Sequence, residues 1–137
     1  MTNSEIERTA VLLLSAELPR PEWTHEAHFA LALWCIRHRP DLAEGDAMRG
    51  LIMRLNTFHG TANTDTSGYH HTITLASLRA ARAVHDPALG LADVLAGLMA
   101  SRFGSSGWIL EHWSKERLFS PEVRRAWVEP DLVPLPF

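Results

Sequence analysis

The sequence has almost none of the features that mark secreted or membrane proteins. Its 137 residues include one cysteine, Cys35, which excludes an intramolecular disulfide and a zinc site built from cysteines. No apolar run reaches the roughly 20 residues of a membrane-spanning helix. Residues 1–8 are polar and acidic, whereas a signal peptide begins with a basic and then an apolar region. We therefore expect a cytoplasmic protein with no membrane partner.

Positive charge is also scarce. Thirteen Lys and Arg residues stand against sixteen Asp and Glu residues, so the formal net charge is −3. Nonspecific binding to nucleic acid requires an excess of basic side chains that hold phosphates, so we expect no nucleic-acid partner. Nucleotide-binding glycine motifs are absent. Residues 104–107 (Gly-Ser-Ser-Gly) also differ from the G-x-S-x-G motif of serine hydrolases.

The composition is that of one ordinary globular domain. Hydrophobic residues make up 46% of the chain and charged residues 21%, which is enough apolar material for a single core. A chain of this length corresponds to about one domain. We therefore expect residues 1–137 to form a single domain.

Helical spacing of apolar residues dominates the chain, and no strand-type alternation persists. Ser4 and Glu7 have the spacing of a capping box, and Thr24 is a candidate N-cap. The prolines at 134 and 136 exclude a helix at the C-terminus. The pattern predicts an all-α, compact single-domain helical bundle. Two short helices are predicted at residues 108–113 and 121–128, and an extended proline-rich tail follows them. The main helices are predicted at residues 5–17, 25–39, 46–58, 69–84 and 91–103.

The eight histidines are distributed unevenly over these predicted helices. If the second, third and fourth helices run up, down and up, then the second begins where the third ends and the fourth begins. That topology would bring five histidines to one end of the bundle, beside the polar loop 61–68. The five are His25, His28, His59, His70 and His71.

This histidine cluster has the chemistry of a metal site. His25 and His28 lie three residues apart, so both rings can face one point on a helix. The positive end of a helix dipole disfavours imidazolium, which leaves a nitrogen lone pair free for a metal. We expect His25, His28 and His70 to be ligands of a divalent transition metal (Zn, Fe, Ni or Cu). His71 or His59 would be a fourth ligand or an acid–base group.

A small-molecule pocket is expected beside the same residues. Trp23 precedes the first two histidines and can form a ligand surface, while Asn63 and Thr64 in the polar loop can shape the pocket. Tyr69 and Thr72 flank the second histidine pair. If the protein is an enzyme, a metal-activated water or dioxygen would act on a small polar substrate, and hydrolytic and oxidative chemistry remain equally open.

Three segments of the sequence resemble a family of short, largely uncharacterised bacterial all-helical proteins. They are Trp23-Thr-His-Glu-Ala-His28, Gly68-Tyr-His-His-Thr72 and a C-terminal stretch that runs from Ser114-Lys-Glu-Arg-Leu118 through Ser120-Pro-Glu to the tail Glu129-Pro-Asp-Leu-Val-Pro-Leu-Pro136. The resemblance marks His25, His28, Tyr69, His70 and Thr72 as site residues and implies no particular activity. The family pattern has Glu where this chain has His71.

A second hypothesis comes from a different class of protein. The histidines can instead form a structural hydrogen-bond network in a non-enzymatic binding or interaction protein. In that case the tryptophans and the proline-rich tail would contact a partner. The metal content of the purified protein distinguishes the two hypotheses.

Overall fold

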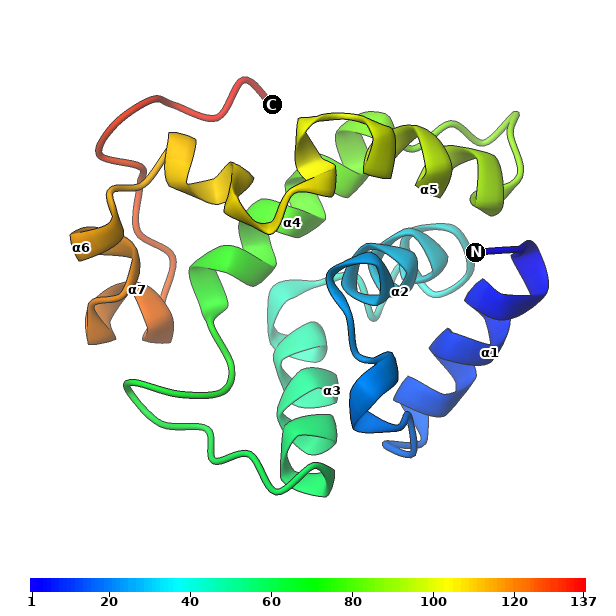
Figure 1. The fold of residues 1–137 in the computed structure, drawn as a ribbon, viewed down its shortest axis with the longest axis horizontal. Helices are drawn as coiled ribbons and strands as arrows, with labels where there is room; N and C mark the ends of the chain where they lie inside the picture. Colours follow the sequence, from blue (N-terminus) through cyan, green and yellow to red (C-terminus); the bar gives the residue numbers. More distant parts are fainter.

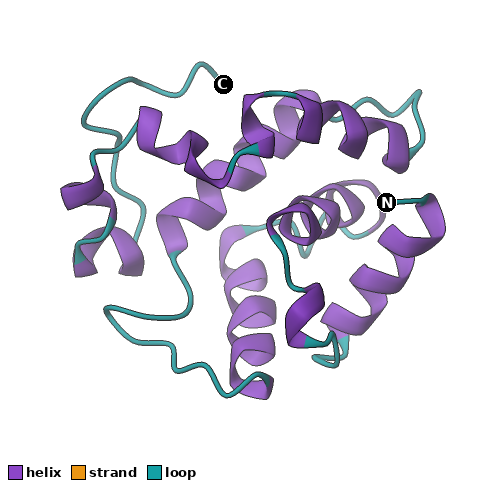
Figure 2. Cartoon of the chain, viewed as in Figure 1, coloured by secondary structure: helices purple, strands orange, loops and turns teal.

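The computed structural model describes residues 1–137 and contains helices, turns and loops but no strand (Figure 2). The predicted all-α class is therefore confirmed. Short helical segments lie between and after five longer helices. The longer helices are α1 (Asn3–Leu14), α2 (His25–His38), α3 (Gly45–Phe58), α4 (His71–Val84) and α5 (Leu91–Ala100). The short segments are η1 (Arg20–Glu22), η2 (Arg102–Gly104), η3 (Ser106–Glu111), α6 (Lys115–Leu118) and α7 (Pro121–Arg125).

The first helix begins earlier than the sequence indicated. Thr2 is the N-cap of α1 and forms the capping box with Glu5, so the prediction of a box between Ser4 and Glu7 was wrong. Both pairs have the same spacing, and the outer pair captures the first free backbone N–H groups. The helix ends at Leu14 because Ala16 adopts a left-handed conformation, with φ of 57°.

The second helix lies at the centre of the fold, with α1, α4 and α5 packed around it (Figure 1). Thr24 is its N-cap, as predicted, and accepts a hydrogen bond from the Ala27 N–H. Every residue from Phe29 to Cys35 is buried. A helix that is apolar on all sides requires neighbours on all sides, so α2 is the core of the bundle rather than an amphipathic surface helix.

The third and fourth helices are joined by the long polar loop that follows His59. The helix α3 ends at Phe58, as predicted, and Gly60 follows with a φ of 75°. The helix α4 begins at His71, and His70 is its N-cap rather than a residue of its first turn. This N-cap is an imidazole whose Nδ1 accepts a hydrogen bond from the Ile73 N–H at 3.2 Å.

The last third of the chain is more irregular than the sequence indicated. The helix α5 stops at Ala100 instead of continuing to 103, because the Ser101 side chain caps η2 by accepting from the Phe103 N–H. The segment predicted as a helix at 108–113 is mostly 3-10 helix, and α6 was not predicted. The helix α7 ends at Arg125 instead of 128.

The tail after α7 is extended, as predicted, and is hydrogen-bonded to the bundle. The indole N–H of Trp113 donates to the Val128 carbonyl, and a ring nitrogen of His112 lies 2.7 Å from the Val133 carbonyl. One cluster of 31 buried residues forms the hydrophobic core. None of the helices is both long and apolar enough to span a bilayer.

Candidate functional site

Two adjoining cavities lie where the beginning of α2, the end of α3 and the beginning of α4 meet. The narrow one has a volume of about 50 Å³ and the wide one about 390 Å³. We call the two together the Trp23 cleft. The two cavities share five of their lining residues: Trp23, His28, Ile52, Ile73 and Thr74. The predicted up, down and up directions of the second, third and fourth helices place these three helix ends together.

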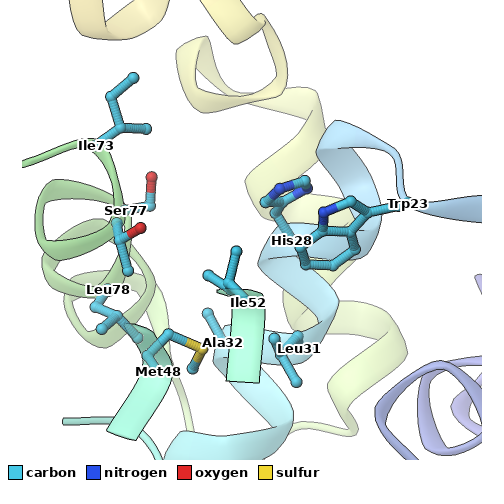
Figure 3. A pocket seen from close by; sticks show the side chains of 10 residues that line it. Trp23, His28, Leu31, Ala32, Met48, Ile52, Ile73, Ser77 and Leu78 are labelled. Atoms are coloured by element: carbon cyan, nitrogen blue, oxygen red, sulfur yellow. The ribbon is translucent and has the colours of Figure 1, made fainter. Parts of the chain in front are cut away.

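The walls of the cleft are mainly apolar. Met48, Ile52 and Leu78 line the narrow part, and Ile73 and Ser77 lie across the opening from Trp23 and His28 (Figure 3). The wide part adds polar groups from the loop and helix ends: Asn56, Thr61, Gly68, Tyr69 and His70. No Asp, Glu, Lys or Arg lines either part. The cleft therefore suits a molecule without formal charge.

Trp23 and His28 form one wall of the cleft as a stacked pair. Their ring centroids are 3.6 Å apart and their planes differ by 23°. The Nδ1–H of His28 donates to the Thr24 carbonyl at 2.6 Å, which leaves Nε2 as an acceptor in the neutral ring. Desolvation by the surrounding atoms lowers the pKa of His28 to about 4, although the residue is exposed at the protein surface. The imidazole is thus uncharged at neutral pH.

His25 and His59 each hold two chain segments together. The Nε2 of His25 lies 2.7 Å from the Phe103 carbonyl oxygen, which connects the start of α2 to η2. The Nε2 of His59 lies 2.7 Å from the Leu18 carbonyl oxygen, which connects the end of α3 to the segment after α1. Neither residue lines the Trp23 cleft. The geometry therefore gives both histidines a structural contact.

His70 uses both ring nitrogens in hydrogen bonds. Nε2 lies 2.7 Å from the Leu118 carbonyl oxygen, and Nδ1 accepts the Ile73 N–H. The residue is buried, and burial lowers its pKa. A neutral imidazole has one N–H and one lone pair, so in this arrangement His70 has no lone pair left for a metal.

His71 lies outside the cleft and pairs with Tyr69. Its Nδ1 is 2.7 Å from the Tyr69 hydroxyl, and both residues are buried. Desolvation lowers the pKa of His71 and raises that of Tyr69, so both groups stay neutral at pH 7. His71 and His59, the predicted acid–base candidates, thus occupy different environments, and neither faces the cavity that contains His28.

The structure does not bring the predicted metal ligands to one point. It contains no group of three or more His, Cys, Asp or Glu side chains that could hold a metal ion. A ring nitrogen of His25, of His28 and of His70 is engaged with a backbone carbonyl in each case. The donor set therefore does not fit a bound Zn, Fe, Ni or Cu ion in this conformation, and the metal site remains a prediction from the sequence.

The predicted substrate-binding residues fall into three different places. Trp23 and Tyr69 line the wide cavity. Asn63 and Thr64 line a separate polar pocket, where the Asn63 side chain accepts from Asn56 Nδ2 and from the Tyr69 N–H. Thr72 is fully buried, donates to the Ala126 carbonyl and accepts from the Val128 N–H. Thr72 therefore anchors the tail and has no access to a ligand.

Sequence reasoning missed the apolar and arginine residues of these cavities. Met48, Ile52 and Ile73 have the spacing of core residues, so nothing in the sequence marked them as cavity walls. Thr74 and Ser77, near Ile73 on α4, were the only detectable signal, because hydroxyls on an apolar helix face require partners. Arg124 is half-buried, whereas Arg125 beside it is exposed.

Comparisons with known proteins identify no relative. No protein-family model, curated protein or solved structure matches the chain. The family resemblance of the histidine and tail segments thus stays a prediction, and functional inference depends on the geometry alone.

Proposed function

We propose that this protein is a cytoplasmic binding protein that holds a small, uncharged, mostly apolar molecule in the Trp23 cleft. Its histidines act as a hydrogen-bond network that supports the walls of the cleft. The observation that carries the proposal is the combination of an apolar cavity without charged residues and one free imidazole acceptor, Nε2 of His28.

The size and lining of the cleft support binding of a small molecule. Ligand pockets are concave, mostly apolar and usually about 300 to 1,000 Å³ in volume, and they contain a few polar groups that orient the ligand. The wide part measures about 390 Å³. Such a volume accommodates a molecule of about one or two rings, with the narrow apolar part receiving a methyl-sized or alkyl end.

Three polar side chains around the narrow part of the cleft can form hydrogen bonds with a ligand, in addition to Asn56 and Thr61 in the wide part. His28 offers an acceptor at Nε2, because its Nδ1–H is bound to Thr24. Ser77 forms no side-chain hydrogen bond within the protein, and Thr74 donates to the His70 carbonyl, which leaves its oxygen free to accept. A ligand with an O–H or N–H donor at one end of an apolar body complements this arrangement.

The low pKa of His28 favours binding over proton-transfer catalysis. A general base works best when its pKa lies near the operating pH. An imidazole with a pKa of about 4 is always deprotonated at pH 7 and is a weak base. Its Nε2 can accept a hydrogen bond from a ligand, but the ring is too weak a base to remove the ligand's proton efficiently.

The experiment compares three probes of the same shape and different charge. Benzyl alcohol, benzoate and benzylammonium are titrated into ¹³C-methyl-labelled protein at pH 7, and the methyl signals of Ile52 and Ile73 are followed by NMR. We expect saturable shifts with benzyl alcohol and weaker or no shifts with the two ions, because their charge would lose hydration without a partner in the cleft.

Two matched variants test the role of His28. In His28→Phe the ring is kept and the acceptor is lost, so benzyl alcohol should bind about 2- to 10-fold more weakly, the worth of one hydrogen bond. His38→Phe changes an exposed histidine at the other end of α2 and should bind as the wild type does. Equal binding of all three probes, or unchanged Ile52 and Ile73 signals, contradicts the proposal.

Metal analysis tests the competing hypothesis directly. Protein purified without a histidine tag is measured for Zn, Fe, Ni and Cu, before and after incubation with each ion. We expect less than about 0.1 equivalent of each to stay bound after dialysis, because metal affinity requires converging free lone pairs. If the protein holds a near-stoichiometric metal ion and the His28→Ala variant loses it, the metal-site hypothesis is correct and the binding proposal is wrong.

A further inference from the structure

The polar pocket lined by Asn63 and Thr64, which shares only Tyr69 with the Trp23 cleft, is rich in arginine. It has a volume of about 150 Å³ and lies between α3, the polar loop and α7. We call it the arginine pocket. Two apolar or aromatic residues, Met53 and Tyr69, contribute to its walls, and the other lining residues are Arg49, Asn63, Thr64, Asp65, Arg124 and Arg125.

Arg49 and Arg124 in this pocket have no carboxylate partner. All ion pairs of the structure involve other arginines, and the one in this pocket joins Arg125 to Asp65. Arg49 Nη2 donates to the Arg125 carbonyl at 3.2 Å. Arg124 Nη1 donates to the Gly68 and Tyr69 carbonyls at 3.0 and 3.4 Å. Neither guanidinium therefore forms an ion pair.

The Nε atoms of the same two arginines are buried without any hydrogen-bond partner. They are the only buried side-chain nitrogen or oxygen atoms in the chain that lack one. Leaving a buried donor unsatisfied is costly, and an unsatisfied group in a native structure commonly indicates a water or an ion. Arg49 and Arg124 both line the arginine pocket, although the two Nε atoms themselves have almost no solvent-accessible surface.

The net charge of the pocket is positive although the chain is acidic. Arg49, Arg124 and Arg125 contribute +3 and Asp65 contributes −1, which leaves +2 against −3 for the whole chain. The Asp65 carboxylate accepts hydrogen bonds from Nε and Nη2 of Arg125, each at 2.7 Å, so it is already engaged. The unmet positive charge is concentrated on Arg49 and Arg124.

We propose that the arginine pocket binds a small oxyanion, a phosphate or carboxylate group, between Arg49 and Arg124. Guanidinium groups bind such oxygens with paired N–H donors, and Arg49 Nη1 and Arg124 Nη2 have no hydrogen-bond acceptor within the protein. The pocket volume of about 150 Å³ is large enough to admit a small oxyanion. The Tyr69 ring, 5.5 Å from the Arg49 guanidinium carbon, supports the fork in place.

The test observes the arginine Nε–H signals directly. ¹⁵N-labelled protein at pH 7 is titrated with sodium phosphate, sodium acetate or sodium chloride at constant ionic strength, and the arginine Nε–H resonances are followed by NMR. We expect saturable shifts at Arg49 and Arg124 with one or both oxyanions and none with chloride. Response to phosphate alone assigns a phosphate ligand, and response to acetate alone assigns a carboxylate.

A variant pair separates a specific site from general charge screening. Arg49→Gln removes one guanidinium together with its hydrogen bond to Arg125 and its contact with the Tyr69 ring. Arg54→Gln removes an exposed arginine of the same helix that lies outside the pocket. We expect oxyanion affinity to fall at least 10-fold in the first variant and to be unchanged in the second. Circular dichroism checks that both variants are folded.

A thermal measurement provides an independent readout. At ten times its dissociation constant, the bound oxyanion should raise the thermal midpoint of the wild type by about 5 °C. Arg49→Gln should lose this increase and Arg54→Gln should keep it. The proposal is overturned if the Nε–H signals of Arg49 and Arg124 do not respond, or if Arg49→Gln binds phosphate and acetate as tightly as the wild type.

Discussion

The Nε2 atom of His70 lies 2.7 Å from the carbonyl oxygen of Leu118, a residue 48 positions further along the chain. The other nitrogen of the same ring caps α4. One side chain therefore begins a long helix and connects it to the short helix α6. This dual use explains why a histidine stands where Ser, Thr or Asp usually caps a helix.

Replacement of His70 tests this structural role. His70→Ala removes a helix cap and a buried hydrogen bond, so the free energy of unfolding should fall by about 2 to 3 kcal/mol. His70→Asn keeps a capping side chain and should recover about half of the loss. Urea denaturation at pH 7 measures both. His38→Ala, at an exposed position, should change stability by less than about 0.5 kcal/mol. Equal effects of His70→Ala and His38→Ala would contradict the role.

Stability should decrease as the pH falls from about 6.5 to about 4. The pKa of His28 is lowered from 6.5 to about 4 in the folded state, and those of His70 and His71 are also lowered. In this window the unfolded chain binds more protons than the folded one, so acid favours unfolding and the stability is fully present only above the unfolded pKa. Urea denaturation at pH 7, 6, 5 and 4.5 measures the trend.

A matched variant assigns part of this pH dependence to His28. His28→Phe cannot be protonated and should lose less stability between pH 7 and 4.5 than the wild type. The hydrogen bond to Arg125 lowers the pKa of Asp65 from its ordinary value of 3.8. Protonation of Asp65 therefore reduces the stability mainly below pH 3.8. A flat profile between pH 7 and 4.5 would show that the folded histidines are not held neutral.

Two glycines near α5 should respond oppositely to the same substitution. A Cβ added at Gly104 would lie 1.9 Å from the Met99 carbonyl oxygen, which is backbone and cannot turn aside. Gly104→Ala should therefore cost more than about 3 kcal/mol or prevent folding. A Cβ at Gly97, an exposed residue inside α5, meets nothing within 4 Å. Gly97→Ala should stabilise the protein by about 0.5 to 1 kcal/mol. Thermal denaturation compares them, and a Gly104→Ala protein of wild-type stability would refute the close contact.

Cys35 should be unreactive in the folded protein. It has no exposed surface, and burial raises the pKa of its thiol to about 12. Thiol reagents attack the thiolate, so a disulfide reagent such as DTNB at pH 8 should label Cys35 only as fast as the protein unfolds. Labelling in 6 M urea should be complete within minutes. Rapid stoichiometric labelling without denaturant would contradict the burial of α2.

Helix positions were predictable from the sequence because they depend on neighbours along the chain. Three features follow from local preferences, and the structure agrees with them: the N-cap Thr24, the end of α3 at Phe58 and the extended tail from Asp131 to Phe137. Errors concentrate where two local signals compete. Thr2 and Ser4 each have a glutamate at the spacing of a capping box, and the structure uses Thr2. The apolar spacing of α5 continues to Phe103, but Ser101 caps the 3-10 helix η2 and α5 ends before it.

The amino-acid sequence alone determined the all-helical class and, through the helix directions, the meeting of His28 with His70 around one cavity. Only the tertiary structure decided what those rings do. Whether an imidazole nitrogen has a lone pair to offer depends on which carbonyl or N–H lies next to it, and those partners, such as Phe103 for His25 and Leu118 for His70, lie 78 and 48 residues away. The unpaired charge of Arg49 and Arg124 was undetectable for the same reason, because an arginine's partner is set by packing.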